Sequence, residues 1–589
     1  PAVEALGSVT VICSEKAGTL TRNEMAVQAV VTAGLVYTVE AVGYAPKGAV
    51  LLDGREVDPG DEPALAELAR AGLLCSDARL HLVGTGWEVV GDPMEGALVA
   101  LALKAGHDAD LVRRQLPRSD EIPFDPEHRF MASLHHRHEG GSVVYVKGAP
   151  ERLLAMCAHQ RTAAGTAPLD PASWHHQVDR LAARGQRVLA LASRDLPAGA
   201  PELTFATVET GLTLLGLVGL IDPPRPEAIA AVADCRRAGI TVKMITGDHA
   251  ATATAIARQL GLADDPVTVT GHQLDGLDAA ALRRVARAAA VFARTSPEHK
   301  LRLVEALQAE GAVVAMTGDG VNDAPALKRA DIGVAMGGRG SEAAKEAAAI
   351  VLADDNFASI AAAVREGRTV YDNLTKMIGW TLPTNGGQAC AVIAAILAGI
   401  TLPVTPVQIL WVNLVSAAAL GVTLAFEPTE PRTMRRPPRR ADAPILSATL
   451  LWQVGFVSLL FVAGALSMFF AALERGLPIE TARTITVNTI VVMEIFYLFS
   501  VRYVHGSSLT WTGVLGTPAV LIGVAAVTLA QLAFTYWPPM QAAFATRPVP
   551  LREGAMILAV GVALLLVVEV EKRLRAMWGG RGRGARSVP

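Results

Sequence analysis

Residues 14–21 read Ser-Glu-Lys-Ala-Gly-Thr-Leu-Thr and directly follow a short apolar run, Val9 to Cys13. The β-branched residues of that run are typical of a buried strand in a parallel sheet. A glycine and hydroxyl residues placed after such a strand offer backbone N–H groups and acceptors that can hold a phosphate at the strand end. The stretch therefore predicts a phosphate site at the carboxyl edge of a parallel sheet.

Composition limits the classes of protein that this chain can belong to. A length of 589 residues is too great for one hydrophobic core, so we expect several domains. The balance of 53 basic against 56 acidic residues gives no reason to expect a nucleic-acid partner. The mean hydropathy of +0.34 is high for a soluble protein, and the apolar residues concentrate in the last third. The five cysteines are far apart and form no CxxC pair, which argues against a disulfide framework or a zinc site and favours a reducing, cytosolic environment.

From about residue 208, short apolar runs alternate with helical stretches, which predicts a doubly wound sheet. The apolar run before Asp222 is expected to be one of its strands. Three further runs lead into polar segments at 246–249, at 294–300 and at 317–325. Because ligands bind at the carboxyl ends of strands in open α/β sheets, we expect these segments to share one site.

The segment 317–325, Thr-Gly-Asp-Gly-Val-Asn-Asp-Ala-Pro, is the most specific pattern in the chain. Asp319 and Asp323 lie four residues apart beside a glycine-rich turn, and Mg²⁺ prefers carboxylates together with phosphate oxygens. The structural alternative is a turn, rich in Asp and Asn, that caps a helix.

Residues 26–205 differ in sequence pattern from the segments on either side, with short strands, Gly/Pro turns and a few amphipathic helices. We expect them to form an inserted domain. Phe124 offers a face on which adenine could stack, and Lys147 and Arg187 offer cations for phosphates. The structural alternatives are a core aromatic for Phe124 and a simple hairpin and turn for the segment 147–151, Lys-Gly-Ala-Pro-Glu.

The segment Ser-Glu-Lys-Ala-Gly-Thr-Leu-Thr-Arg-Asn-Glu resembles the phosphorylation loop of P-type ion-pumping ATPases, which normally reads Asp-Lys-Thr-Gly-Thr-Leu-Thr. Two residues depart from that pattern: Glu15 replaces the aspartyl nucleophile and Ala17 replaces a threonine. The order of the segments 91–98, 123–129 and 147–151, followed by Arg187, resembles the nucleotide-binding domain of the type II members.

The resemblance implies a haloacid-dehalogenase-like (HAD-like) phosphoryl-transfer site that uses Mg²⁺ and ATP. It assigns Asp319, Glu15, Asp323 and the backbone carbonyl of Ala17 to Mg²⁺. The other catalytic residues implied are Lys16, Thr246, Gly247, Asp248, Lys300 and Asn322, with Thr246 and Gly247 holding phosphoryl oxygens and Lys300 neutralising charge. The nucleotide-binding residues implied are Glu95, which would accept from the adenine amino group, and Phe124, Arg129, Lys147, Gly148 and Arg187.

Six apolar segments in the last third are each long enough, at roughly 20 residues, to cross a bilayer. They lie near residues 377–400, 404–426, 449–472, 484–504, 517–536 and 554–570. The basic segments at 432–440, near Arg502 and from Lys572 to Arg586 are alternate connections, so the positive-inside rule places them in the cytosol. The soluble domains before the first segment are expected on the same side.

Polar residues within these segments are candidates for a transport site. They are Asn385 and Gln388 in the first, Asn413 and Ser416 in the second, and Glu494 in the fourth. They resemble positions in the fifth, sixth and eighth helices of type II pumps. Calcium pumps of the family carry Glu and Asp where this chain has Gln388 and Ala417, so we expect poor Ca²⁺ selectivity, and a monovalent cation or a proton as cargo. The structural alternative is interhelical hydrogen bonding.

The sequence thus predicts an α/β HAD-like phosphorylation domain with an inserted α+β nucleotide-binding domain, followed by an all-α bundle of six transmembrane helices. The expected bounds are 1–25 and 206–357 for the phosphorylation domain, 26–205 for the nucleotide-binding domain, 358–376 for a stalk helix, 377–574 for the membrane helices and 575–589 for a basic cytosolic tail. Because the chain begins at Pro1 and its first strand starts within ten residues, we expect an N-terminal half, with the actuator domain and four helices, to be missing.

The leading functional hypothesis is ATP-driven cation transport through an acyl phosphate, in a bacterial plasma membrane. The alternative is a catalytically inactive, nucleotide-binding pseudo-pump that regulates or scaffolds membrane proteins. A soluble phosphatase of the same catalytic fold is disfavoured by the six apolar segments. The expected partners are ATP, the transported cation and the lipid bilayer.

Overall fold

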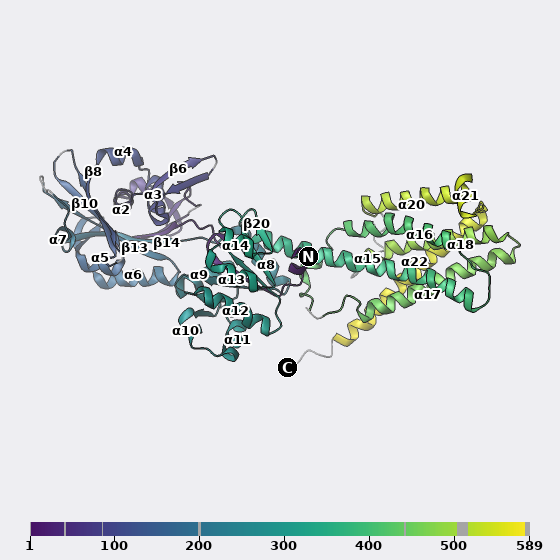
Figure 1. Cartoon of the computed structure of the whole chain (residues 1–589). Coiled ribbons are helices and arrows are strands. Elements are labelled where there is room, and N and C mark those ends of the chain that lie inside the picture. Colours follow the sequence, from purple (N-terminus) through teal and green to yellow (C-terminus); the bar gives the residue numbers. More distant parts are fainter. Residues whose placement is uncertain are drawn as a thin grey trace. The chain divides into compact units, whose positions relative to one another are not determined.

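The computed structural model describes residues 2–40, 43–84, 86–125, 127–138, 140–197, 202–440, 443–503 and 516–583. These residues fall into two units. One comprises Val9–Ala362, and the other comprises Val3–Ser8 with the chain from Ala363 onward. Figure 1 labels the sheets and short helices of the first unit and the long helices of the second.

The first unit contains a seven-stranded parallel sheet in the order β16-β17-β15-β1-β18-β19-β20. The predicted nucleophile strand β1 (Val11–Glu15) lies at its centre, between β15 (Thr241–Thr246) and β18 (Val314–Gly318). The other strands are β16 (Thr268–Thr270), β17 (Val291–Ala293), β19 (Ile332–Met336) and β20 (Ile350–Leu352). The connecting helices are α8 (Pro226–Arg237), α9 (Ala250–Leu260), α10 (Gly271–Asp275), α11 (Ala279–Ala288), α12 (Pro297–Ala309), α13 (Ala324–Arg329) and α14 (Glu342–Ala347), with a 3₁₀ turn η3 (Val321–Asp323). The doubly wound sheet predicted from the sequence is confirmed.

The inserted domain is built on an eleven-stranded sheet whose main path runs β5-β4-β3-β2-β14-β13-β10-β9-β8. Its strands are β2 (Ala26–Thr32), β3 (Leu35–Val39), β4 (Val50–Leu52), β5 (Arg55–Val57), β8 (Arg118–Asp125), β9 (Phe130–His136), β10 (Ser142–Gly148), β11 (Cys157–Thr162), β12 (Gly165–Pro168), β13 (Arg187–Leu196) and β14 (Leu212–Ile221). A separate hairpin pairs β6 (Arg79–Val83) with β7 (Gly86–Val90). The helices are α2 (Pro63–Leu74), α3 (Pro93–Lys104), α4 (Ala109–Gln115), α5 (Pro150–Met156), α6 (Pro171–Ala183) and α7 (Phe205–Val208), with a 3₁₀ turn at Pro59–Asp61. Two hydrophobic cores, one including side chains of α2 and α3 and the other side chains of α5 and α6, pack against this sheet.

The position of β14 corrects one sequence-based expectation. The run before Asp222 was expected in the parallel sheet, but β14 pairs antiparallel with β2 and β13 in the inserted domain. A central strand is buried on both faces in either kind of sheet, so its apolar run does not reveal which sheet it joins. The inserted domain therefore ends after Ile221, and the expected boundary at residue 205 is wrong.

The two chain segments that connect the parallel-sheet domain to the inserted domain contact each other. Thr21 forms an isolated antiparallel bridge with Pro224. The carboxylate of Asp222 accepts hydrogen bonds from the Thr21 hydroxyl at 2.5 Å and from the backbone N–H of Glu24 at 3.3 Å. The outgoing and returning chain segments therefore form one double-stranded connection.

The second unit is helical and begins with α1 (Ala2–Leu6), which the sequence did not predict. Within the described residues, five helices are long and apolar enough to cross a membrane: Pro406–Phe426 (α16, Pro406–Ala419, with the 3₁₀ turn η4), α17 (Ala448–Glu474), α18 (Ile479–Val501), α20 (Pro518–Tyr536) and Leu551–Arg575 of α22 (Leu551–Arg583). A short helix α21 (Pro538–Phe544) and a 3₁₀ turn at Thr433–Arg435 complete the unit. Helix α18 packs against α16, α17, α20 and α22, and most of its apolar window is buried.

The predicted stalk and first membrane segment form one 41-residue helix, α15 (Phe357–Leu397). Helix α15 is less apolar than the five candidate membrane helices, because Pro383, Asn385 and Gln388 lie within its apolar half. A sixth membrane crossing by α15 stays a prediction. Helix α22 continues through the expected tail as far as Arg583, and residues 584–589 lie outside the described chain.

The central place of β14 predicts that the nucleotide-binding domain folds only when this strand is present. A polypeptide of residues 26–225 should unfold cooperatively, whereas residues 26–205 should not, because removing β14 separates β2 from β13 and exposes both cores. Circular dichroism during thermal and urea unfolding would measure the difference. Equal unfolding midpoints for the two polypeptides would contradict this assignment.

Candidate functional site

Three carboxylates meet at the carboxyl edge of the parallel sheet. Glu15 is the last residue of β1, Asp319 follows β18, and Asp323 closes the 3₁₀ turn after it. One oxygen from each lies within 4.8 Å of the others, and Asp323 is buried. Such a set of carboxylate oxygens fits Mg²⁺, a hard cation that takes oxygen ligands. The same residues also form a capped turn, since Asp323 Oδ2 accepts from the Gly320 N–H at 3.0 Å.

Lys300 supplies the positive charge in this cluster. Ser296 caps α12 by accepting a hydrogen bond from the His299 N–H, and this places Lys300 on the first turn of the helix. Lys300 is 9% exposed, and its ammonium bonds to Glu15 Oε1 and, at 2.5 Å, to Asp323 Oδ1. One lysine therefore joins β1, α12 and the turn after β18.

The ionisation of this cluster follows from its burial. Burial raises the pKa of Glu15 to about 7, against the opposing charge of Lys300, and the carboxylates of Asp323 and Asp319 raise it further. Burial lowers the pKa of Lys300, but the charges of Glu15 and Asp323 outweigh it, so the net shift is upward. Lys300 is thus held as an ammonium ion between two carboxylates.

The loop after Glu15 turns at Gly18, whose φ of +75° is a left-handed conformation that suits glycine. Lys16 points toward the neighbouring loops, and its ammonium lies 2.8 Å from Asp248 Oδ2 and 3.4 Å from Asp222 Oδ2. The backbone N–H of Glu15 donates to Thr317 Oγ1 at 3.1 Å. Sequence reasoning did not assign roles to Asp222 and Thr317, although Thr317 begins the recognised segment 317–325.

The predicted phosphoryl-binding residues lie at the end of β15. The Asp248 N–H donates to Thr246 Oγ1 at 3.1 Å, and no atom lies within 4 Å of a Cβ built on Gly247. Asn322 is exposed on the turn beside Asp323. The predicted catalytic residues thus lie at strand ends, in the loops that follow them and on the first turn of α12, while their individual roles remain predictions.

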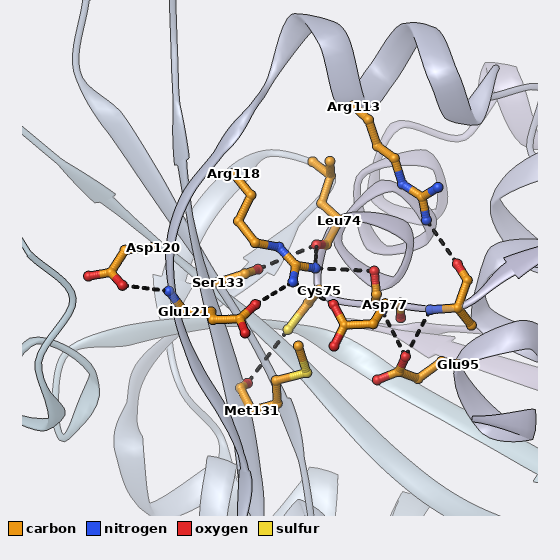
Figure 2. A network of polar contacts seen from close by, with 12 residues as sticks. Leu74, Cys75, Asp77, Glu95, Arg113, Arg118, Asp120, Glu121, Met131 and Ser133 are labelled. Atoms are coloured by element: carbon orange, nitrogen blue, oxygen red, sulfur yellow. Dashed lines mark hydrogen bonds and ion pairs between the residues drawn. The ribbon is translucent and has the colours of Figure 1, made fainter. Parts of the chain in front are cut away.

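The predicted nucleotide-binding residues centre on an ion pair between Lys147 Nζ and Glu95 Oε1, 2.5 Å apart. Glu95 Oε2 accepts from the backbone N–H groups of Asp77 at 2.7 Å and Ala78 at 3.1 Å, as Figure 2 shows. Both oxygens of Glu95 are thus engaged by the protein itself. A role as acceptor for adenine would use the remaining lone pairs of this carboxylate.

Phe124 is 61% exposed on β8, so the alternative that it is a core aromatic is wrong. Arg187 is exposed at the start of β13. It lies four residues before Leu191, which pairs with Lys147 on β10. Because side chains alternate along a strand with a period of two, Arg187 and Lys147 lie on the same face of the sheet. A Cβ on Gly148 would lie 2.5 Å from the carbonyl oxygen of Arg129, whose own φ is +60°.

The segment 147–151 is a strand end followed by helix α5, with Pro150 in the first turn. The alternative of a hairpin and turn at this segment is therefore wrong.

A polar cluster lies inside the helical unit. Gln388 Nε2 on α15 donates to Glu494 Oε1 on α18 at 2.8 Å, and Ser416 on α16 lies beside the same carboxylate. Gln388 Oε1, Ser416 Oγ and Glu494 Oε2 are buried and have no hydrogen-bond partner within the described residues. Interhelical hydrogen bonding thus accounts for Gln388 Nε2 and Glu494 Oε1 only. The three oxygens without a partner among the described residues are available to a cation.

Two predicted residues do not join this cluster. Asn385 is exposed on α15, and Asn413 is half-buried on α16. Their assignment to a transport site has no support from the contacts of the described residues.

The parallel sheet with its carboxylate cluster at the carboxyl edge is a HAD-like fold. Models described as "haloacid dehalogenase-like hydrolase" match residues 158–331 and 300–364. A model described as "P-type ATPase, cytoplasmic domain N" matches residues 64–227, a range that includes β14, and "Cation transporting ATPase, C-terminus" matches residues 401–574.

Relatives extend the match to nearly the whole chain. The "Probable cation-transporting ATPase F" of Mycobacterium tuberculosis is 48% identical over 98% of this chain and 64% of its own length. The "Cation-transporting ATPase pma1" of Synechocystis is 43% identical over 98% of this chain and 65% of its own length. The human "Calcium-transporting ATPase type 2C member 1" is 36% identical over 98% of this chain and 61% of its own length.

This chain belongs to the P-type cation-transporting ATPases and is an integral membrane protein. It spans somewhat less than two thirds of the length of these relatives.

Replacing Lys300 by methionine is expected to destabilise the parallel sheet by about 3–5 kcal/mol when no divalent cation is present, because Glu15 and Asp323 would lose their shared counter-charge beside Asp319. Mg²⁺ should restore more stability to this variant than to the unaltered chain. Hydrogen–deuterium exchange of β1 and β18, with and without Mg²⁺, measures both effects.

The matched control is Lys345→Met, which removes an ammonium paired with Glu342 on the surface helix α14. Equal protection losses in the two variants would show that Lys300 has no special role.

Proposed function

We propose that this chain provides the nucleotide-binding, phosphoryl-transfer and C-terminal membrane parts of an ATP-driven cation pump in a bacterial plasma membrane, with its soluble domains in the cytosol. The observation that carries the proposal is the cluster of Glu15, Asp319 and Asp323 around Lys300 at the edge of the parallel sheet. Positioning and charge neutralisation of this kind are what phosphoryl transfer requires.

In the proposed reaction, a carboxylate oxygen of Glu15 attacks the γ-phosphorus of ATP, and the bond from that phosphorus to the β,γ-bridging oxygen breaks. ADP leaves, and an acyl phosphate remains on Glu15 until water hydrolyses it. Lys300 neutralises charge on the transferring group, and Thr246 and Gly247 hold its oxygens. Asp319, Asp323 and the carbonyl of Ala17 would hold Mg²⁺, which supplies further neutralisation of the phosphate charge.

The residues at positions 15 and 17 lead us to propose that this phosphorylation is slow. Compared with the aspartate of the resembled motif, Glu15 carries one more methylene, which moves the attacking oxygen outward by up to about 1.5 Å. A misplacement of that size costs roughly 10²-fold in rate. Ala17 also lacks the hydroxyl of the resembled threonine, although its backbone carbonyl is retained. This is the observation that favours the second candidate function, a nucleotide-binding pseudo-pump that regulates or scaffolds membrane proteins.

The unaltered chain is expected to form roughly 10²-fold less phosphoenzyme than the double variant Glu15→Asp/Ala17→Thr, with Glu15→Asp alone in between. Radiolabelled ATP, acid quench and hydroxylamine sensitivity measure the acyl phosphate. If the unaltered chain reaches the level of the double variant at the same rate, the proposed loss of activity is wrong.

For the nucleotide, we propose that adenine stacks on Phe124 and that Lys147 and Arg187 face the phosphates. Lys147→Ala should weaken ATP binding by about tenfold or more, since it removes a charge-assisted contact from a site of low exposure. Calorimetry on residues 26–225 provides the measurement, with Lys47→Ala, an exposed lysine of the same domain, as control. Undetectable ATP binding by the unaltered domain would refute the assignment.

For the cargo, we propose that Gln388, Ser416 and Glu494 contribute oxygens to a site for a monovalent cation or a proton. Gln388 and Ser416 are uncharged, so Glu494 is the single anionic ligand in this set, whereas Ca²⁺ sites use several. In the full-length protein, Glu494→Gln should abolish cation-dependent ATPase activity, and micromolar Ca²⁺ should give no stimulation of the unaltered protein. Stimulation by micromolar Ca²⁺ would overturn this choice of cargo.

A further inference from the structure

A cavity of about 240 Å³ opens in the nucleotide-binding domain beside the end of α2. Three arginines line it: Arg79 at the start of β6, Arg113 on α4 and Arg118 at the start of β8. Asp77 is the carboxylate in the lining. The volume is several times the roughly 30 Å³ that one water occupies in the liquid, so the cavity can hold a polyatomic ion with water.

Arg118 forms part of the wall of this cavity and is engaged by other residues of the domain. Figure 2 shows its guanidinium beside Leu74, Asp77 and Glu121. Nη2 donates to the carbonyl oxygens of Leu74 at 3.0 Å and Ser76 at 3.1 Å, and Nη1 bonds to Asp77 and Glu121, each at 2.5 Å. Its charge is therefore balanced by the two carboxylates, and it fixes the segment that follows α2.

Arg79 and Arg113 are not balanced in this way. Arg113 Nη2 donates to the carbonyl oxygen of Ala78 at 3.0 Å, and its other N–H groups have no acceptor among the described residues. Within the same residues, no carboxylate lies within ion-pair distance of either arginine. Burial lowers the pKa of Arg113, and the charges of Arg79 and Arg118 lower it further, against the attraction of Asp110 and Asp77.

The remaining titratable group in the lining is His135 on β9. Burial lowers its pKa to about 4, so the ring is neutral near pH 7. Its Nδ1 bonds to the carbonyl oxygen of Leu116 at 2.9 Å. The positive charge of the cavity thus comes from the arginines alone.

We propose that this cavity binds a phosphate-class oxyanion, held by Arg79 and Arg113. Guanidinium groups match the geometry of phosphate oxygens and are weakly hydrated. The half-buried Arg113, which has free donors, and the exposed Arg79 beside it are therefore suited to this ligand. The bound anion would also relieve the repulsion among the three arginines.

The site shares its wall with the proposed nucleotide site. Ser76 Oγ accepts from Lys147 Nζ at 3.4 Å, and the N–H groups of Asp77 and Ala78 hold Glu95. Along β9, Met131 pairs with Lys147 and His135 lies four residues further, about 13 Å away. An anion on Arg113, which holds the Ala78 carbonyl, would therefore act on the Glu95–Lys147 pair through the segment 76–78. The anion site itself does not rest on the proposed pump activity.

Free phosphate and the phosphates of a nucleotide share this chemistry, and the test separates them. Equilibrium dialysis of the whole chain in detergent micelles would use labelled inorganic phosphate, pyrophosphate and ADP as separate probes. The double variant Arg79→Gln/Arg113→Gln is expected to weaken phosphate or pyrophosphate binding by at least about tenfold. Arg55→Gln, an exposed arginine on β5 at the opposite end of the sheet path, should leave it unchanged.

If the double variant weakens ADP binding equally, the anion is part of a nucleotide; if ADP binding is kept, it is a free ion. Lys147→Ala, run alongside, identifies a failure of the proposed nucleotide site separately. Phosphate should also protect Arg113 of the unaltered chain from phenylglyoxal, which is measurable by mass spectrometry without any variant. The absence of saturable anion binding and of this protection, or binding that the correctly folded double variant retains, would overturn the proposal.

Discussion

The balance of charge around Lys300 is the constraint on which the carboxylate cluster of Glu15, Asp319 and Asp323 depends. Three carboxylates that could share one metal ion repel each other in a partly buried site, and the Lys300 ammonium holds two of them by direct contact. The contact with Glu15 joins segments that are 285 residues apart in the sequence. The cap at Ser296 belongs to the same arrangement, because it fixes the first turn of α12 and hence the position of the ammonium.

The carboxylate cluster and the polar cluster inside the helical unit give a carboxylate different partners. Glu15 is paired with the Lys300 ammonium, which it shares with Asp323. Glu494 is paired with the neutral amide of Gln388, which donates one hydrogen bond and contributes no charge. A cation at Glu494 would therefore supply the missing counter-charge, whereas a cation at Glu15 would add to the positive charge that Lys300 already supplies.

The sequence predicted those parts of the fold that follow from local pattern. Apolar runs that end in Gly- and Asp-containing loops predicted the parallel sheet, and with it the meeting of Glu15, Asp319 and Lys300 at one edge. The pattern could not assign β14, because an apolar strand buried on both faces fits either sheet. It also could not show that Phe124 is exposed or that Glu95 is held by the N–H groups of Asp77 and Ala78, since both facts depend on long-range pairing. The pattern did not distinguish Asn385 and Asn413 from Gln388 and Glu494, because burial within a bundle depends on neighbouring helices.

The adjacency of β2 and β14 has a consequence for the order of folding during synthesis. The nucleophile strand β1 is made early, but its partner β15 emerges only after the whole inserted domain. Closing an unstructured loop of roughly 220 residues is costly, and shortening it to about 20 lowers the entropic penalty by about 2 kcal/mol. When the inserted domain folds, pairing of β2 with β14 brings residues 21 and 224 together and shortens that loop. Folding of the inserted domain is thus expected to ease the pairing of β1 with β15, in addition to anything that the domain binds.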